Sequence, residues 1–301
     1  MNILLTGSNG FLGKTFYNYL SKDNCVFTLN RNNSDYNYDL SFQIPNFTEC
    51  FEIVIHAAGK AHFVPRNSIE GDLFEKNNIN GTLNLLKGFN KDRLPKKFIF
   101  ISSVSVYGRN FGELISEDTT LQATDYYGLS KIKTEQIIIN WCMKNNIIFT
   151  ILRLPLVVGM NPPGNLLNMI NAIKDGKYFN IGNGDTRKSM VLAEDVAKYL
   201  LISSNHNGVF NLTDGKHPSF REISLKIAKD LNKKNIIKIP YSIAYVIAFF
   251  LSIFGSFSPF NLKVLNKMTK TLTFSDELAK RTFNWSPQCV LNFNFLNNDS
   301  K

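Results

Sequence analysis

The stretch Thr6-Gly7-Ser8-Asn9-Gly10-Phe11-Leu12-Gly13 stands between a short apolar run, residues 2–6, and a helical pattern that reaches about Leu20. Strand, Gly-x-x-Gly-x-x-Gly and helix in this order let backbone N–H groups approach a diphosphate at a helix N-terminus. Three glycines can also mark a simple tight turn. Their place between strand and helix favours a dinucleotide site, with contacts expected from Gly7, Asn9, Gly10, Phe11, Leu12 and Gly13.

Apolar runs and helical periodicity alternate along the first half of the chain. We expect strands at 2–6, 25–29, 51–55, 97–102 and 147–152, and helices at 11–20, 69–89 and around Tyr127. Such alternation predicts an α/β fold with a doubly wound parallel (Rossmann) sheet, whose ligands lie at the carboxyl ends of the strands. We therefore expect a dinucleotide-binding domain over residues 1–155. Residues 156–301, with helices at 193–203 and 220–231 and a strand at 209–212, are expected to form mainly a smaller substrate-binding lid that is not cleanly separable.

Composition and charge limit the classes of function. Hydrophobic content of 44% and charged content of 19% over 301 residues are ordinary for a soluble globular protein. The net charge of +10 suits an anionic ligand, but the basic residues are scattered and their longest clusters are pairs. This pattern argues against nucleic-acid binding.

The cysteines and the first residues indicate the compartment. Cys25, Cys50, Cys142 and Cys289 are far apart and form no C-x-x-C pair, so we expect free thiols and no metal site. The sequence opens directly on an apolar strand, which predicts no targeting peptide and a cytoplasmic protein.

Cofactor specificity is expected to depend on the end of the second strand. An acidic residue there would bind the adenosine ribose hydroxyls and select NAD, but the chain has Asn30-Arg31. A missing carboxylate and a nearby guanidinium tolerate a 2′-phosphate, so the sequence slightly favours NADP over NAD. The alternative is that Arg31 is a solvated loop residue. The pair Asp39-Leu40 stands where a carboxylate could bond the adenine amine, or where an aspartate could simply cap a turn.

Small residues follow the next strand, in His56-Ala57-Ala58-Gly59. Ala57, Ala58 and Gly59 at a strand's carboxyl end let a flat cofactor lie against the backbone. No nucleophile pattern accompanies His56, so we interpret it as a structural residue.

Tyr127 and Lys131 are the candidate catalytic pair. Four residues apart on a helix, they lie on the same face, and an ammonium there would lower the pKa of the tyrosine from its usual value of about 10. Such a tyrosine can exchange protons near neutral pH. The pattern alone is weak. It gains weight because Ser103, at a strand end, and the glycine loop are expected at the same edge of the sheet.

One long segment, residues 239–262, contains no charged residue. A membrane span needs about 20 apolar residues, and Pro240, Gly255 and Pro259 interrupt this run. We therefore expect no transmembrane segment but a buried or interfacial helix. Contact of residues 241–257 with a membrane surface or a partner is the alternative.

Several motifs together carry a resemblance to a known family. They are Thr6-Gly7-x-x-Gly10-x-x-Gly13, His56-Ala57-Ala58-Gly59, Asn78-Ile79-Asn80-Gly81-Thr82, Ser102-Ser103 with Val106-Tyr107-Gly108, Tyr127 with Lys131, Arg153-Leu154-Pro155 and Trp285-Ser286-Pro287. Over nearly its whole length the chain resembles the extended short-chain dehydrogenase/reductase family, in its nucleotide-sugar epimerase branch. It is similar there to UDP-glucose 4-epimerases and to bacterial 4-keto reductases that make N-acetylquinovosamine-type sugars.

The resemblance implies roles for individual residues. Tyr127 would exchange the proton of the sugar 4-hydroxyl, Lys131 would lower its pKa and bind the nicotinamide ribose, and Ser103 would hydrogen-bond the oxygen that becomes a ketone. Two further residues, Asn78 and Pro155, would contact the cofactor, which is NAD or NADP. Asn165 and Arg187 match positions that hold the nucleotide diphosphate; a loop cap and a surface charge are their alternative roles.

Absent residues narrow the implied reaction. Related sugar 4,6-dehydratases carry acidic residues directly after the catalytic Ser/Thr, whereas Val104 and Ser105 follow Ser103 here. Ser105 also replaces the Glu of related decarboxylases and the Cys of GDP-fucose synthase. Hydride transfer at carbon 4 of a nucleotide sugar, a UDP-hexose or UDP-N-acetylhexosamine, is what the remaining groups support.

Three functions stay open from the sequence. The first is a 4-epimerase acting through a 4-keto intermediate. The second is an NAD(P)H-dependent reductase of a UDP-4-keto-6-deoxy sugar in surface polysaccharide biosynthesis. The third, of a different class, is a nicotinamide-binding sensor without turnover, which is disfavoured because such proteins usually lose the Tyr or the Lys. We also expect a homodimer.

Overall fold

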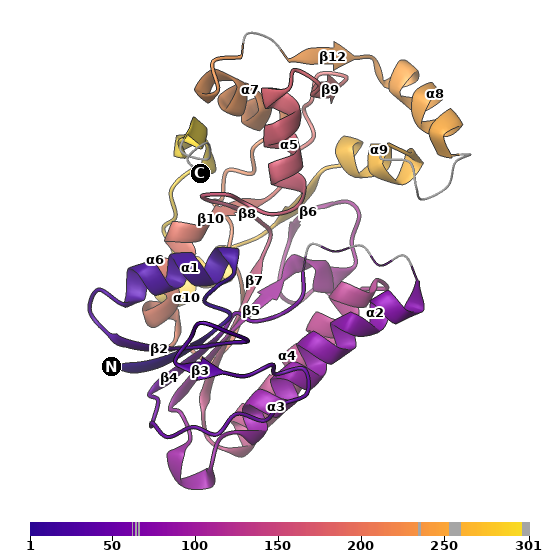
Figure 1. Cartoon of the computed structure of the whole chain (residues 1–301). Coiled ribbons are helices and arrows are strands. Elements are labelled where there is room, and N and C mark those ends of the chain that lie inside the picture. Colours follow the sequence, from indigo (N-terminus) through magenta and orange to yellow (C-terminus); the bar gives the residue numbers. More distant parts are fainter. Residues whose placement is uncertain (62, 64, 66, 234–235, 253–259, 297–301) are drawn as a thin grey trace.

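A seven-stranded parallel sheet forms the centre of the lower part of the molecule (Figure 1). The structure is a computed structural model, and it describes the chain except residues 62, 64, 66, 234–235, 253–259 and 297–301. The strand order is β11-β7-β5-β4-β1-β2-β3, and every neighbouring pair is parallel. The strands are β1 (Asn2–Thr6), β2 (Cys25–Asn30), β3 (Tyr36–Asn37), β4 (Ile53–His56), β5 (Lys97–Ser103), β7 (Ile148–Leu154) and β11 (Gly208–Asn211).

Helices cover both faces of this sheet (Figure 1). On one face lie α1 (Phe11–Leu20), α6 (Ala193–Ser203) and α10 (Glu277–Phe283). The other face carries α2 (Ser68–Phe74), a π-helical turn η1 (Glu75–Asn80), α3 (Gly81–Lys87), the short turn η2 (Lys91–Arg93) and the long α4 (Tyr126–Lys144). The doubly wound α/β fold expected from the sequence is therefore confirmed.

The two apolar layers follow from the alternation of side chains along each strand. Leu4 of β1 packs toward α3 and α4, whereas its neighbours Ile3 and Leu5 pack toward α1 and α6. Val54 of β4 alternates with Ile53 and Ile55 in the same way. Because both faces are covered, these strands read as continuous apolar runs. Full burial of each such side chain contributes about 1.5–3 kcal/mol to folding.

A smaller part stands above the carboxyl ends of the strands (Figure 1). It contains paired short strands and a third apolar cluster between α5 and α7. Its elements are β6 (Gly112–Ile115), β8 (Leu156–Val158), α5 (Asn165–Lys174), β9 (Phe179–Ile181), β10 (Met190–Leu192), α7 (Phe220–Asp230), β12 (Ile237–Ile239), α8 (Tyr241–Ser252), α9 (Leu262–Thr269), β13 (Leu272–Phe274) and the turns η3 (Val104–Tyr107) and η5 (Val290–Asn292).

The chain crosses between the two parts more often than the sequence indicated. The strand expected in the lid at 209–212 is β11, which pairs in register with β7 as the seventh strand of the main sheet. α6 and α10 also return to the sheet, where α6 packs beside α1 and α10 packs on β11 through Phe283 and Phe210. The local pattern predicted these elements, but not their partners, because pairing depends on residues more than 50 positions away in β7.

α8, the described part of the apolar segment after Ile239, is largely exposed, which corrects the expectation of a buried helix and leaves that of an interfacial helix. The buried residues of α8 are Ala244 and Ala248, which pack in one cluster with Ile181 and Leu265. Most of its large side chains are exposed. The remainder of the segment, 253–257, lies outside the described residues. Among the described residues, no helix has the length and apolar character needed to cross a membrane.

Candidate active site

The glycine loop after β1 is shaped by close backbone contacts. Gly7 has φ +76°, and a Cβ there would lie 2.8 Å from the backbone of Ala58. A Cβ on Gly13 would lie only 2.0 Å from the carbonyl oxygen of Gly7. α1 begins at Phe11, and its N-cap Gly10 supplies no side-chain hydrogen bond to the helix amides. The first amides of a helix have no intrahelical acceptor, so the loop fits the diphosphate of a dinucleotide.

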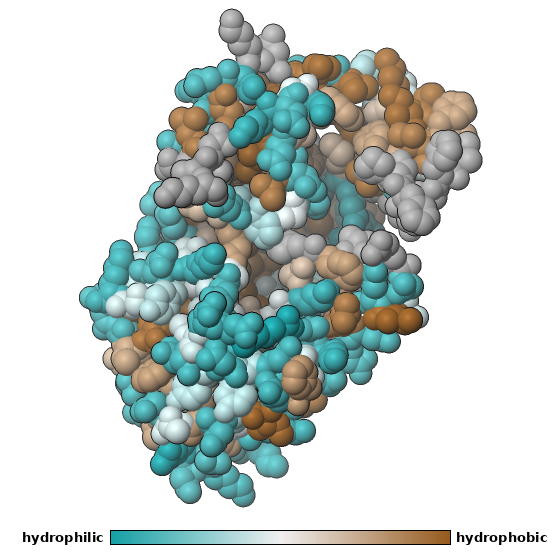
Figure 2. All heavy atoms as spheres, viewed as in Figure 1, coloured by the Kyte–Doolittle hydropathy of each residue, from teal (hydrophilic) through white to brown (hydrophobic). Residues whose placement is uncertain are grey.

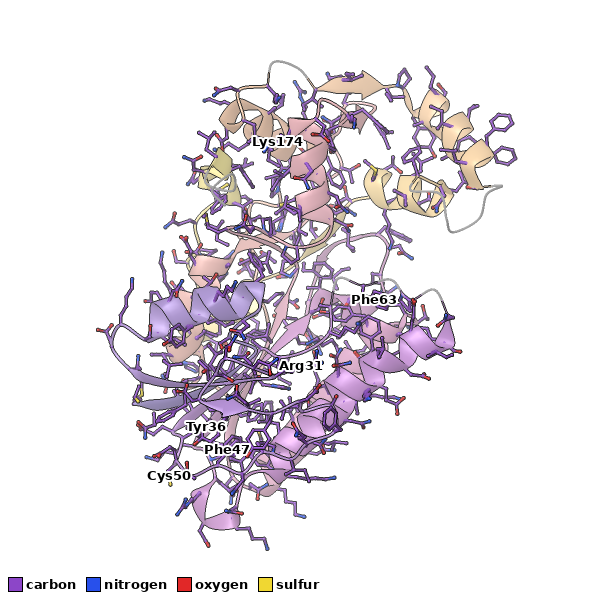
Figure 3. All side chains as sticks on the ribbon, in the orientation of Figure 1. Arg31, Tyr36, Phe47, Cys50, Phe63 and Lys174 are labelled. Atoms are coloured by element: carbon purple, nitrogen blue, oxygen red, sulfur yellow. The ribbon has the colours of Figure 1, made fainter. Side chains whose placement is uncertain are left out.

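The end of β2 is held by amide and ion-pair contacts. One of them is made by Arg31, which is labelled in Figure 3. The Asn30 side chain donates to Ser8 Oγ at 2.7 Å and accepts from the Asn9 N–H at 3.3 Å. Arg31 Nε lies 3.0 Å from Asp39 Oδ2, and its Nη2 donates to Asn77 at 2.7 Å. Arg31 and Asp39, assigned separate roles from the sequence, therefore form one ion pair at the expected adenosine end of the site.

Leu40 lies differently from its neighbour Asp39. Its side chain is 8% exposed and belongs to the apolar cluster under α3. Its carbonyl oxygen accepts from the Asn84 side chain at 2.8 Å. A contact of Leu40 with a cofactor stays a prediction.

His56 is a structural residue, as interpreted from the sequence. Its ring nitrogens lie 2.7 Å from Thr6 Oγ1 and 2.9 Å from Thr82 Oγ1. Burial, with the positive charge of Lys131, lowers the pKa of His56 to about 3. The neutral ring thus links β1, β4 and α3 beneath the glycine loop.

Asn78 fixes the segment that follows Gly59. It lies in the π-helical turn η1, and its side chain accepts from the Lys60 N–H at 2.7 Å and donates to Ser130 at 2.8 Å. Ser130 in turn donates to the carbonyl oxygen of Tyr127. π-Helical turns often occur at functional sites. Here the turn joins the predicted cofactor segment to the helix of the candidate catalytic pair.

Ser103 and Tyr127 meet at the carboxyl edge of the sheet. Ser103 ends β5, and Tyr127 stands in the first turn of α4, where Asp125 caps the helix by accepting from the Gly128 N–H at 2.9 Å. The Ser103 hydroxyl acts on the pKa of Tyr127 as a nearby hydrogen-bonding group, and it lowers that pKa. Ser103 also accepts from the N–H and the hydroxyl of Ser105, at 3.2 and 3.1 Å. A serine and a tyrosine hydroxyl are therefore positioned together where a substrate oxygen could bind.

The pKa of Tyr127 differs from the sequence expectation. Burial raises it above the usual value, and the Ser103 hydrogen bond offsets only part of that rise. Lys131 does not act on it as the i, i+4 spacing suggested, because its ammonium donates to the Ile101 carbonyl oxygen at 2.9 Å. Its Nζ lies 5.9 Å from the centre of the Tyr127 ring. The expected lowering of the tyrosine pKa is thus wrong in this structure.

Lys131 itself is strongly perturbed. Burial lowers its pKa to about 8, while the carboxylate of Glu135 acts in the opposite direction. Its Nζ lies 4.5 Å from the centre of the Phe100 ring, and a Cβ on Gly59 would lie 3.7 Å from it. Lys131 therefore stands between the predicted cofactor segment and Tyr127, still mainly an ammonium at neutral pH.

A buried ion pair joins α4, the helix of Tyr127 and Lys131, to β7, and it was not predicted from the sequence. Arg153 of β7 binds Glu135 of α4 through Nη2 at 2.7 Å and Nε at 3.1 Å. Glu135 also accepts from Ser102 at 2.5 Å, and Arg153 donates to the Tyr107 hydroxyl at 3.0 Å. An arginine inside an otherwise apolar strand was the available signal, since a buried charge needs a partner.

The residues expected to hold the substrate diphosphate lie in the smaller part. Asn165 is exposed and begins α5 after Gly164. Arg187 is half-exposed, donates to the His217 carbonyl oxygen at 3.0 Å and lies 3.6 Å from Glu222. Pro155 is half-buried between β7 and β8. Figure 2 shows the surface hollowed between the two parts of the molecule.

Comparison with known proteins gives the family. Residues 3–212 match the NAD dependent epimerase/dehydratase family. A UDP-glucose 4-epimerase of Vibrio cholerae is 27% identical, over 98% of this chain and 93% of the relative. An N-acetyl-alpha-D-glucosaminyl-diphospho-ditrans,octacis-undecaprenol 4-epimerase of Escherichia coli O157:H7 is 26% identical, over 77% of this chain and 73% of the relative.

Solved structures show the same fold. A UDP-glucose 4-epimerase superimposes with a TM-score of 0.75 at 20% identity, over 99% of this chain and 95% of that one. RMD from Pseudomonas aeruginosa, complexed with NADPH, superimposes with a TM-score of 0.71 at 21% identity, over 99% and 97%. The expectation of an NAD(P)-dependent enzyme is confirmed by the family match. The chain belongs to the NAD-dependent epimerase/dehydratase family.

Proposed function

We propose that this enzyme is a nucleotide-sugar 4-epimerase that acts through a 4-keto sugar. The observation that carries the proposal is the meeting of Ser103, at the end of β5, with Tyr127, in the first turn of α4, while the Lys131 ammonium lies one helical turn away. Val104 and Ser105 follow Ser103, so the additional acid and base that dehydration requires are missing at these positions. Hydride transfer coupled to proton transfer is the chemistry that these groups support.

The proton steps use the two hydroxyl groups. A bound nicotinamide would supply the hydride transfer, from carbon 4 of the sugar and back to it. As carbon 4 loses hydride, its hydroxyl loses a proton to the Tyr127 oxygen and becomes a ketone oxygen. The Ser103 hydroxyl donates to that oxygen while negative charge develops on it. Return of hydride to the opposite face, with the proton returned from Tyr127, gives the 4-epimer.

Tyr127 must ionise for the first step, and burial opposes this. Lys131 is the nearby positive group that would stabilise the phenolate, once its ammonium leaves the Ile101 carbonyl oxygen and turns toward Tyr127. A pKa of about 8 leaves it mainly charged at neutral pH. We therefore assign Lys131 to tuning the tyrosine and to binding the cofactor ribose.

The substrate is proposed to be a hexose linked through a diphosphate. Both relatives described above carry such a substrate in their names: one UDP-glucose, the other an N-acetylglucosaminyl diphosphate. Asn165 and Arg187 are our candidates for the diphosphate, because a helix N-terminus and a guanidinium both bind phosphate oxygens. The nucleotide form, a UDP-hexose or UDP-N-acetylhexosamine, is our first choice.

A 4-keto sugar reductase is the second candidate, and the end of β2 favours it. Asn30 replaces the carboxylate that would select NAD, and Arg31 is 63% exposed at its side chain. Arg31 could bind a 2′-phosphate by exchanging its contact with Asp39. An NADPH that exchanges at each turnover fits a reductase better than an epimerase.

A substrate panel separates these functions. Purified protein is given UDP-glucose and UDP-N-acetylglucosamine alone, or a UDP-4-keto-6-deoxy sugar with NADH or NADPH. The proposal expects the 4-epimer without added cofactor, with deuterium on carbon 4 retained in the product by mass spectrometry. Stoichiometric loss of NAD(P)H with the keto sugar would establish the reductase instead. Cofactor binding without turnover of any of these would contradict both and favour a sensor.

A further inference from the structure

α8 presents an unusual apolar surface for a helix in water (Figure 2). Its buried side chains are the small Ala244 and Ala248, and Ser252 at its C-terminal end accepts a hydrogen bond from the Leu262 N–H. Seven large side chains are between 41% and 59% exposed: Tyr241, Ile243, Tyr245, Val246, Ile247, Phe249 and Phe250. A surface helix normally turns its apolar side chains to the core and its polar ones to solvent. Apolar patches of this kind mark interaction sites.

The charges in the sequence that flanks α8 are all of one sign. The sequence from 231 to 275 contains no Asp or Glu, and its charged residues are Lys233, Lys234, Lys238, Lys263, Lys267 and Lys270. Lys238 is exposed on β12, which leads into α8, and Lys267 is exposed on α9, which packs on Ala244 and Ala248 through Leu265. An apolar helix flanked only by lysines complements a surface that is apolar inside and anionic outside.

The dimensions of α8 suit an interface and not a span. Its 12 residues extend about 18 Å, whereas the hydrocarbon core of a bilayer is about 30 Å thick. Tyr241 and Tyr245 stand at its N-terminal end, next to Lys238. Tyrosine rings and lysine side chains favour the level of the lipid headgroups.

We propose that α8 docks this enzyme on the surface of an anionic phospholipid bilayer, with its exposed apolar side chains in the headgroup boundary. A second copy of the chain is a poorer occupant, because an interface centred on α8 would bring two lysine-only segments together. Interfacial helices bind through buried apolar area plus attraction to anionic lipids, and α8 with its flanks supplies both. The inference is independent of which sugar the active site takes.

Vesicle flotation of the full chain tests this assignment. The vesicles contain phosphatidylcholine alone, or phosphatidylcholine with phosphatidylglycerol in roughly equal amounts. We expect the wild type to float with the anionic vesicles and to be released as salt is raised. The double variant Phe249→Glu/Phe250→Glu should weaken binding about 100-fold, since two apolar anchors are lost and two negative charges are added.

Matched variants distinguish docking through α8 from nonspecific binding through other exposed apolar side chains. Phe42→Glu/Ile44→Glu changes two side chains that are 66% and 52% exposed outside α8, and should leave binding unchanged. Lys238→Gln/Lys267→Gln should weaken binding about 25-fold, and only on anionic vesicles. Failure of the wild type to float, or equal losses in the Phe42/Ile44 variant, would overturn the proposal. The proposal would also be overturned if the wild type formed a dimer in analytical ultracentrifugation and did not bind vesicles, while the Phe249/Phe250 variant was a monomer.

Discussion

Replacing Lys131 by methionine removes a buried ammonium, and its effect on stability can be worked out from the structure. Burial lowers the pKa of Lys131 from 10.5 to about 8, so the folded protein releases this proton before the unfolded chain does. Between these pH values the unfolded chain binds more protons, and the free energy of unfolding therefore rises with pH. At about 1.36 kcal/mol per pKa unit, the rise from pH 7 to pH 9.5 is about 2 kcal/mol. The penalty for burying the charge is fully present below pH 8.

Urea unfolding of the wild type and of Lys131→Met at several pH values between about 7 and 9.5 measures the contribution of Lys131 to the free energy of unfolding. Other titrating groups cancel in the difference between the two proteins, so the wild type should gain about 2 kcal/mol relative to the variant across this range. Lys133→Met is the matched control, because Lys133 is exposed on the same helix and its loss should leave the wild-type dependence in place. If the free energy of unfolding changed with pH in the same way for the wild type and Lys131→Met, the lowered pKa of Lys131 would be refuted.

Three further substitutions test the buried ion pair between Glu135 and Arg153 and the predicted cofactor site. Glu135→Gln leaves Arg153 buried without its counter-charge and should cost about 3–5 kcal/mol in urea unfolding, whereas exposed Gln136→Ala should cost little; a loss below about 1 kcal/mol would contradict the ion pair. Gly13→Ala places a Cβ against the Gly7 carbonyl oxygen and should weaken NADH binding, followed by fluorescence, at least about tenfold; unchanged affinity would exclude the tight loop. Arg31→Ala should weaken NADPH binding at least about tenfold and NADH binding less than about threefold, and equal effects would remove the case for NADP.

Much of the fold and of the candidate site could be predicted because the signals are local. Gly7 and Gly10 lie between β1 and α1, Gly13 lies in the first turn of α1, and Gly7 and Gly13 make the close backbone contacts that glycine permits. Ser103 and Tyr127 were each expected at a carboxyl strand edge, and the parallel sheet brings their hydroxyls together. A parallel sheet gathers all its strand ends on one side, so correct strands were enough to predict this meeting.

Other features depend on distances that a pattern does not contain. Helix periodicity placed Lys131 on the face of Tyr127, but not the Ile101 carbonyl oxygen that holds its ammonium, nor the burial that raises the tyrosine pKa. The partner of Arg153 lies on a different element and is fixed only by packing. The apolar run of α8 predicted a helix that avoids water. A core helix and a helix at an interface share this property, so the run could not distinguish between them.

The catalytic role of Tyr127 is tested most directly by the kcat of Tyr127→Phe on the sugar nucleotide that the wild type converts. The change removes one hydroxyl, and the adjacent Tyr126→Phe removes the same group from a ring that is 45% exposed. We predict that Tyr127→Phe loses at least about a hundredfold in kcat and that Tyr126→Phe stays within about twofold. Full turnover by Tyr127→Phe would contradict proton exchange by this tyrosine, and with it the proposed mechanism.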